Sequence, residues 1–188
     1  MSEQVREVFQ GKVIRLNVER VRLPNGQLAE LEIAHHPGGA AVVAIDAQSR
    51  VCLLRQYRHA AGGWVDELPA GKLDGGEAPL ACAQRELAEE AGMHAGHWTA
   101  LGPFFTSPGV LTEVIHLFLA RGLTPVAARP EVHEVIEPRW LPLTEALELA
   151  TSARLMDGKS IVGLVWADHV LRSTPAVAPT DAARSGIA

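Results

Sequence analysis

The most informative pattern in the sequence lies in residues 71–93, GKLDGGEAPLACAQRELAEEAGM. Its second half predicts a helix over about residues 77–91, with Pro79 tolerated in the first turn and Gly92 just past the end. Apolar side chains recur there at helical spacing, and we expect them to face the core: Leu80, Leu87 and Ala91.

Three glutamates share one face of this predicted helix, because residues three and four apart are neighbours on a helix. They are Glu86, Glu89 and Glu90. Crowded carboxylates repel one another unless a cation lies among them, and such oxygen ligands suit Mg²⁺, with Mn²⁺ as a possible substitute. A solvated acidic face is the alternative for the helix alone. The glycine-rich loop before it favours the cation, since it can place backbone carbonyls beside the same ion.

The spacing within this stretch resembles the Nudix box, which is glycine, five residues, glutamate, seven residues, Arg-Glu, an aliphatic residue, any residue, Glu-Glu, any residue, glycine and an aliphatic residue. Every defined position is filled, by Gly71, Glu77, Arg85, Glu86, Leu87, Glu89, Glu90, Gly92 and Met93. Outside the box, a looser resemblance extends from about residue 10 to residue 171.

The resemblance implies an α/β fold, a Nudix-type α/β/α sandwich around a mixed β-sheet, and a metal-dependent hydrolase of nucleoside diphosphates linked to another group. Carried over by position, Glu86 and Glu90 are the principal metal ligands, and Glu89 is a further ligand or polarises water. The carbonyl of Ala70 is a backbone ligand. The residues that shape the motif are Gly71, Glu77, Arg85 and Gly92.

Features on both sides of the box resemble the ADP-ribose pyrophosphatase branch of the family. Arg58 matches a substrate-contacting arginine and Glu67 a residue near the substrate, with a surface salt bridge as the alternative for either. Pro108 and Gly109 lie where the branch carries a substrate-contacting proline, and a plain turn is the alternative there.

The general base of that branch lies in an acidic loop before a strand. Registering the chain on Trp140 places this base on Glu134, with Glu131 second. The resemblance therefore implies cleavage of ADP-ribose to AMP and ribose 5-phosphate. A pyrophosphatase for GDP-mannose or a UDP-sugar is the alternative among enzymes, and a non-catalytic ADP-ribose sensor is the alternative outside them.

The chain divides into three expected parts. Residues 1–36 form N-terminal antiparallel strands, including a hairpin that turns at Pro24-Asn25-Gly26, and in the branch such strands cross to the partner of a homodimer. Residues 37–172 form the Nudix domain and residues 173–188 a disordered tail. Further strands are expected over 40–45, 51–57, 114–120 and, interrupted by Pro138, 135–141; helices are expected over 144–150 and 161–171.

The composition limits the partners. The net charge of the 188 residues is −5, and the basic residues are scattered, so we expect no nucleic-acid ligand. No run of about 18 apolar residues suggests a membrane span, and the polar first residues do not resemble a secretion signal, so a cytoplasmic location is expected. Cys52 and Cys82 lie in apolar surroundings and are expected to be reduced and buried.

Two weaker motifs lie outside the box. Gly158-Lys159-Ser160 hints at a phosphate-binding P-loop, but Ala153 stands where that loop needs glycine, so the start of a helix is the better interpretation. His35-His36 would reach a substrate only if the loop before Ala40 folds over the site, and we do not include the pair among the site residues.

Overall fold

The computed structural model describes residues 2–130 and 132–173. The N-terminal strands are β1 (Ser2–Gln10), β2 (Arg15–Arg22) and β3 (Leu28–His35). Next come β4 (Gly39–Ala44), β5 (Arg50–Arg58), the 3₁₀ turn η1 (His59–Ala61), β6 (Gly63–Glu67), β7 (Ala70–Lys72) and α1 (Pro79–Ala91). The last elements are β8 (Met93–Phe105), β9 (Val114–Pro125), β10 (Ile136–Pro142), α2 (Leu143–Thr151) and α3 (Gly158–Ser173). Glu131 and almost all of the expected tail lie outside the described residues.

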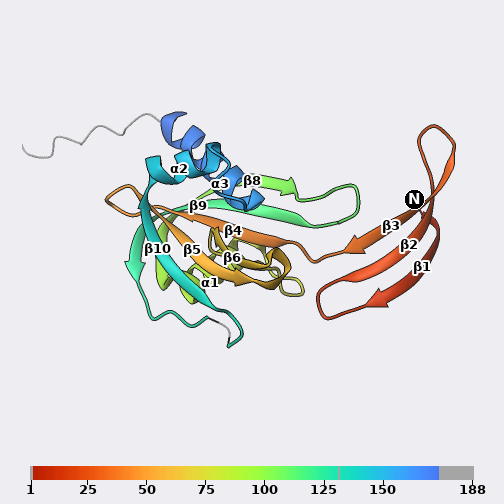
Figure 1. Ribbon diagram of the computed structural model, residues 1–188, viewed down its shortest axis with the longest axis horizontal. Coiled ribbons are helices and arrows are strands. Elements are labelled where there is room, and N and C mark those ends of the chain that lie inside the picture. The colour runs from red at the N-terminus through yellow and green to blue at the C-terminus, as the bar shows by residue number, and fades with distance from the viewer. Residues whose placement is uncertain (1, 131, 174–188) are drawn as a thin grey trace, which may run out of the picture.

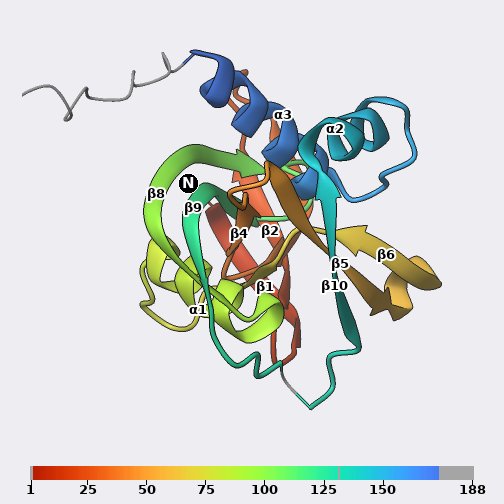
Figure 2. The ribbon, with the colours of Figure 1, turned by 90° about the vertical axis from the view of Figure 1, so that its left-hand side faces the viewer.

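The body of the molecule is an α/β/α sandwich, as expected. A mixed sheet of order β7-β4-β9-β8, in which β4 and β9 are parallel, lies beside an antiparallel sheet of order β10-β5-β6. Helix α1 covers one side of these sheets and α2 and α3 the other (Figures 1 and 2). Successive residues of β4 alternate between the two cores: Val42 packs with α1, and Val43 packs with α2 and α3.

Helix α1 starts two residues later than predicted. The carboxylate of Glu77 accepts a hydrogen bond from the Asp74 N–H at 3.2 Å, and the Glu77 N–H donates to the Asp74 carbonyl at 2.8 Å, so this glutamate belongs to the preceding loop. The end of the helix is as predicted, with Gly92 in the left-handed region at φ 62°.

The prediction that Leu80 faces the core is wrong, because it is 38% exposed. It lies in the first turn of α1, where Cys82 and Ala83 occupy the buried positions instead. Their small side chains let the helix approach the sheet closely, and Leu87 and Ala91 are buried as expected.

Strand β8 has no clear pattern in its own sequence, which contains Gly96, Gly102 and Pro103. It forms because it pairs antiparallel with β9 along nearly its whole length, and a bulge between Ala100 and Gly102 absorbs the irregularity. Strand β10 continues through Pro138, contrary to the expected interruption. Among the described strands it pairs with β5 alone and so lies at an edge of its sheet, where the missing N–H of proline is tolerated.

The three N-terminal strands form a separate antiparallel sheet that extends from one end of the body (Figure 1). The predicted hairpin joins β2 to β3, and Gly26 takes a positive φ of 83° in its turn. Strand β1 lies within the expected region of N-terminal strands, although its own bounds were not predicted, and it pairs antiparallel with β2.

Both cysteines are free and buried, as predicted. Burial raises the pKa of Cys52 and of Cys82 to about 12, so both thiols stay protonated near neutral pH. Among the described residues, no helix is both long enough and apolar enough to traverse a lipid bilayer.

Candidate active site

Two of the predicted metal ligands are buried carboxylates on α1. Glu86 is 7% exposed and Glu90 is 2% exposed. The backbone N–H of Ala70, at the start of β7, donates to Glu90 Oε2 at 2.8 Å, which ties the helix to the predicted backbone ligand. Burial raises the pKa of Glu90 to about 8 and also raises the pKa of Glu86, because desolvation disfavours their charged forms.

Arg85 connects the loop of the box to its helix. Its Nη1 donates to Glu86 Oε1 at 2.7 Å and to Glu89 Oε2 at 3.2 Å. Its Nε and Nη2 donate to the two carboxylate oxygens of Glu77 at 3.1 and 3.0 Å, and Nη2 also reaches the Lys72 carbonyl. These charge-assisted bonds raise the pKa of Arg85, and they hold the loop and the acidic face in one arrangement.

Gly71 has a steric role in the same arrangement. A Cβ atom built on this residue would overlap the carboxylate of Glu86. The glutamate can therefore lie against the backbone of β7 only because position 71 carries no side chain. Gly75, in the loop that follows, has open space where its Cβ would lie.

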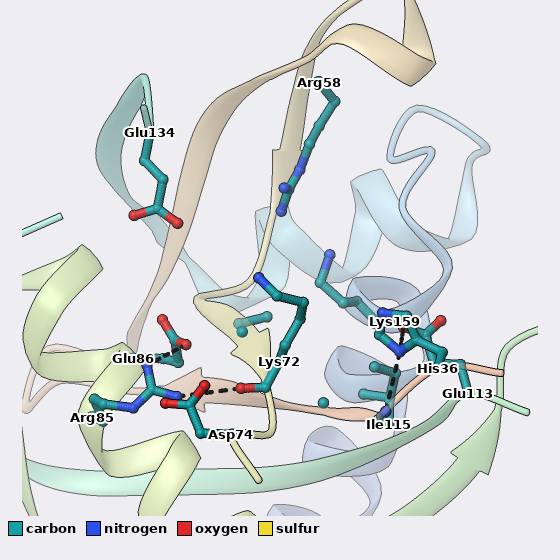
Figure 3. A pocket seen from close by; sticks show the side chains of 14 residues that line it. His36, Arg58, Lys72, Asp74, Arg85, Glu86, Glu113, Ile115, Glu134 and Lys159 are labelled. Atoms are coloured by element: carbon teal, nitrogen blue, oxygen red, sulfur yellow. Dashed lines mark hydrogen bonds and ion pairs between the residues drawn. The ribbon is translucent and has the colours of Figure 1, made fainter. Parts of the chain in front are cut away.

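A cleft opens beside these carboxylates and contains charges of both signs (Figure 3). Glu134 reaches it from the loop before β10, and its carboxylate points toward Glu86. The negative charge of Glu134 contributes to the raised pKa of Glu86 and Glu90. Besides Arg85, three cations line the cleft: Arg58, Lys72 and Lys159.

The two residues predicted on the approach to the box form an ion pair. Arg58 Nε donates to Glu67 Oε1 at 2.7 Å, and the Glu67 side chain is almost fully buried while Arg58 lines the cleft. A salt bridge between the two residues is therefore present, but its carboxylate is buried, so it is not the surface salt bridge that was the alternative for either residue. Arg58 still presents part of its guanidinium to the cleft, because its side chain is 43% exposed.

Pro108 and Gly109 do not line the cleft among the described residues. They lie in the loop between β8 and β9, which is joined to β3 by hydrogen bonds on both sides of Ala34. The Ala34 N–H donates to the Val110 carbonyl at 2.8 Å, and the Thr112 N–H donates to the Ala34 carbonyl at 3.0 Å. Within one chain this loop connects the N-terminal sheet to the body, and substrate contact by Pro108 and Gly109 stays a prediction.

Sequence reasoning missed several residues of the cleft. Helix α3 does begin at Gly158, as predicted, but Lys159 in its first turn bonds to buried Glu67 and lines the cleft. A lysine in the first turn opposes the helix dipole, and this was the available sign that another group holds it. His36 also lines the cleft, with Nδ1 at 3.1 Å from Glu113 Oε1.

The site fits a divalent cation chemically. Within residues 2–130 and 132–173, no three His, Cys, Asp or Glu side chains are already gathered closely enough to enclose a metal. Glu86 and Glu90 are nevertheless buried carboxylates that a cation would compensate, and Glu89 lies at the edge beside Arg85. Together with the Ala70 carbonyl they offer only oxygen donors, the set that Mg²⁺ and Mn²⁺ prefer.

Residues 35–159 match the family model of the NUDIX domain, so the chain belongs to the Nudix family. Its relatives include an ADP-ribose pyrophosphatase of Bacillus subtilis, 40% identical over 85% of this chain and 88% of that protein. A methanol dehydrogenase activator of Bacillus methanolicus is 39% identical over the same shares. The fold also matches the crystal structure of an ADP compounds hydrolase, with a TM-score of 0.79 and 20% identity over 92% of this chain and 94% of that one. The predicted membership of the family, and the resemblance to ADP-ribose pyrophosphatases, are confirmed.

We predict that Gly71→Ala lowers turnover about 100-fold, because displacing a ligand such as Glu86 by about an ångström is enough for a loss of this size. Only the end of a flexible side chain must move, so the melting temperature should change little. The matched control is Gly75→Ala in the loop that follows β7, where an added Cβ meets nothing within 4 Å. Equal turnover for the two variants would show that the position of Glu86 does not matter.

Proposed function

We propose that this protein hydrolyses the pyrophosphate bond of ADP-ribose with Mg²⁺, producing AMP and ribose 5-phosphate. The observation that carries the proposal is the cleft itself, in which Glu86 and Glu134 lie near Arg58, Lys72 and Lys159. A diphosphate between two ribosides needs both kinds of group, cation-binding carboxylates at one part and direct cationic contacts at another. The relative from Bacillus subtilis that is 40% identical, an ADP-ribose pyrophosphatase, supports this choice of substrate.

Different residues of the chain would bind the cation and the phosphate. Glu86, Glu90 and the Ala70 carbonyl would hold the cation, and the Ala70 N–H keeps Glu90 oriented. Bound Mg²⁺ supplies positive charge to the diphosphate and lowers the pKa of a coordinated water. Arg58 offers its terminal guanidinium nitrogens to a phosphate, since only its Nε is used by Glu67.

Glu134 is our candidate for the general base. It comes from the loop before β10 and lines the cleft, and its carboxylate points toward Glu86 (Figure 3). A carboxylate in this place can accept the proton of a water that attacks phosphorus beside the bound cation. Glu131, the second candidate, lies outside the described residues.

The substrate is tested with a panel of ADP-ribose, GDP-mannose, UDP-glucose, NADH and diadenosine polyphosphates, assayed for phosphate release with Mg²⁺ and added phosphatase. We expect kcat/KM for ADP-ribose to exceed the others by at least about tenfold, a difference of about 1.4 kcal/mol in transition-state binding. A preference for GDP-mannose or UDP-glucose would keep the chemistry and reject the substrate. Binding without turnover of any compound would favour a sensor.

The base is tested with Glu134→Gln, which keeps the size of the side chain and removes its basicity. We expect kcat to fall about 10²- to 10⁴-fold with little change in substrate affinity, the range typical for loss of a general base. Glu137→Gln, an exposed glutamate three residues further along, is the control and should retain full activity. An unaffected kcat in Glu134→Gln would move the base to another residue.

We also propose that the protein is a homodimer held by its N-terminal sheet. This sheet extends from the body (Figure 1), and its exposed apolar side chains have no cover within the described chain. They include Val5, Val8 and Phe9 on β1 and Leu28 and Leu31 on β3. Apolar side chains exposed together on a projecting sheet indicate an interface.

The dimer is tested by the molar mass in light scattering after size exclusion. We expect twice the chain mass for the wild type and the mass of a single chain for Val5→Glu/Phe9→Glu, because burying two carboxylates costs more than the interface gains. Val165→Glu changes an equally apolar, 43% exposed residue on α3 and should leave the mass unchanged. A wild type that runs as a single chain at all concentrations would contradict the proposal.

A further inference from the structure

The carboxylate of Glu67 lies beneath the cationic part of the cleft and is 2% exposed. Two cations share it. Arg58 Nε donates to Oε1 at 2.7 Å, and Lys159 Nζ donates to Oε2 at 2.5 Å. A buried carboxylate with one oxygen for each cation is well compensated, and it determines which atoms of each cation stay available.

Lys159 is itself held firmly. Its ammonium also donates to Asp157 Oδ1 at 3.0 Å, and its side chain is only 14% exposed. The other oxygen of Asp157 accepts hydrogen bonds from the N–H and the hydroxyl of Ser160. The Ser160 hydroxyl in turn accepts a bond from the Leu68 N–H at 2.7 Å, which ties the start of α3 to the residue after Glu67.

Arg58 is held by one nitrogen only. Among the described residues its terminal nitrogens have no protein partner, and Figure 3 shows the guanidinium pointing into the cleft toward Lys72. A free carboxylate normally binds guanidinium through two parallel bonds, one to each oxygen. Here Lys159 holds the second oxygen of Glu67, and among the described residues Arg58 bonds to the first oxygen through Nε alone, so this two-bond arrangement is not formed.

We propose that Lys159 is a positioning residue for binding of the substrate diphosphate. Its ammonium holds Oε2 of Glu67, so that the terminal nitrogens of Arg58 stay directed into the cleft. Without the ammonium of Lys159, both oxygens of Glu67 bind the guanidinium of Arg58, and its terminal nitrogens turn away from the phosphate. The inference rests on the proposed function, because it concerns how the diphosphate of that substrate is bound.

The test is a double-mutant cycle on KM and kcat with Lys159→Met, Arg58→Ala and the combined variant. We expect Lys159→Met to raise KM about tenfold with kcat within about twofold, because it weakens binding of ground state and transition state alike. In the Arg58→Ala background the same change should raise KM by less than about twofold, since the residue through which it acts is gone. Lys159→Arg, which keeps a cation beside Glu67, should restore most of the affinity.

Lys72→Met is the matched control. It removes the same charge from the same cleft, but the Lys72 ammonium has no carboxylate partner among the described residues, so its effect on KM should add to that of Arg58→Ala. Equal coupling of Lys72 and Lys159 to Arg58 would indicate general electrostatics and overturn the inference. Full additivity for Lys159, or an unchanged KM, would overturn it as well.

The experiment also distinguishes a variant that fails to fold, and a wrong choice of substrate, from failure of the inference itself. If Lys159→Met does not fold, Lys159→Gln replaces it with the same readouts, because the amide keeps one hydrogen bond to Glu67 without the charge. The cycle uses whichever nucleoside diphosphate sugar the wild type cleaves fastest, so a substrate other than ADP-ribose rejects the proposed function alone. If none is cleaved, the Kd of ADP-ribose by calorimetry replaces KM, and equal values for wild type and Lys159→Met overturn the inference.

Discussion

The hydrogen bond from the Ala70 N–H to Glu90 holds α1 against β7 at the point where the chemistry is proposed. A carboxylate that is 2% exposed is costly to bury, and one backbone donor does not compensate its charge. Other residues of the site add to this uncompensated buried charge or limit its cost. Gly71 makes room for a second buried carboxylate, that of Glu86, and Arg85 binds that carboxylate from the outside. These two buried carboxylates, Glu86 and Glu90, are the reason why we propose a cation between the helix and the strand.

The two sheets give the cleft its mixed charge. Helix α1 and β7 bring Glu86 and Lys72, whereas the other side of the cleft is built from β5, β6, the first turn of α3 and the loop before β10. These bring Arg58, Glu67, Lys159 and Glu134. Both sheets pack against the same helices, and this packing places the acidic and the basic groups around one cleft. A substrate with two linked phosphates can then contact both groups at once.

Sequence alone predicted the part of the site that lies on one local element. The spacing of Glu86, Glu89 and Glu90 gives their shared face directly, and their helix begins and ends close to the predicted residues. The sequence could not show which residues from distant parts of the chain contact one another. Lys159 meets Glu67 across 92 residues, and β8 exists because β9 pairs with it rather than through its own pattern. The prediction that Leu80 faces the core was wrong for a related reason. The helical period shows which face of α1 is apolar, but not which turns of that face contact the sheet.

Binding of a divalent cation by Glu86 and Glu90 is measured with Mn²⁺ by electron paramagnetic resonance. We expect one or more tight sites in the wild type and a loss of affinity of at least about tenfold in Glu90→Gln, since even the loss of a residue that supports a ligand typically costs this much. The exposed Glu148→Gln on α2 should bind like the wild type. Equal Mn²⁺ affinity in Glu90→Gln and the wild type would contradict the claim.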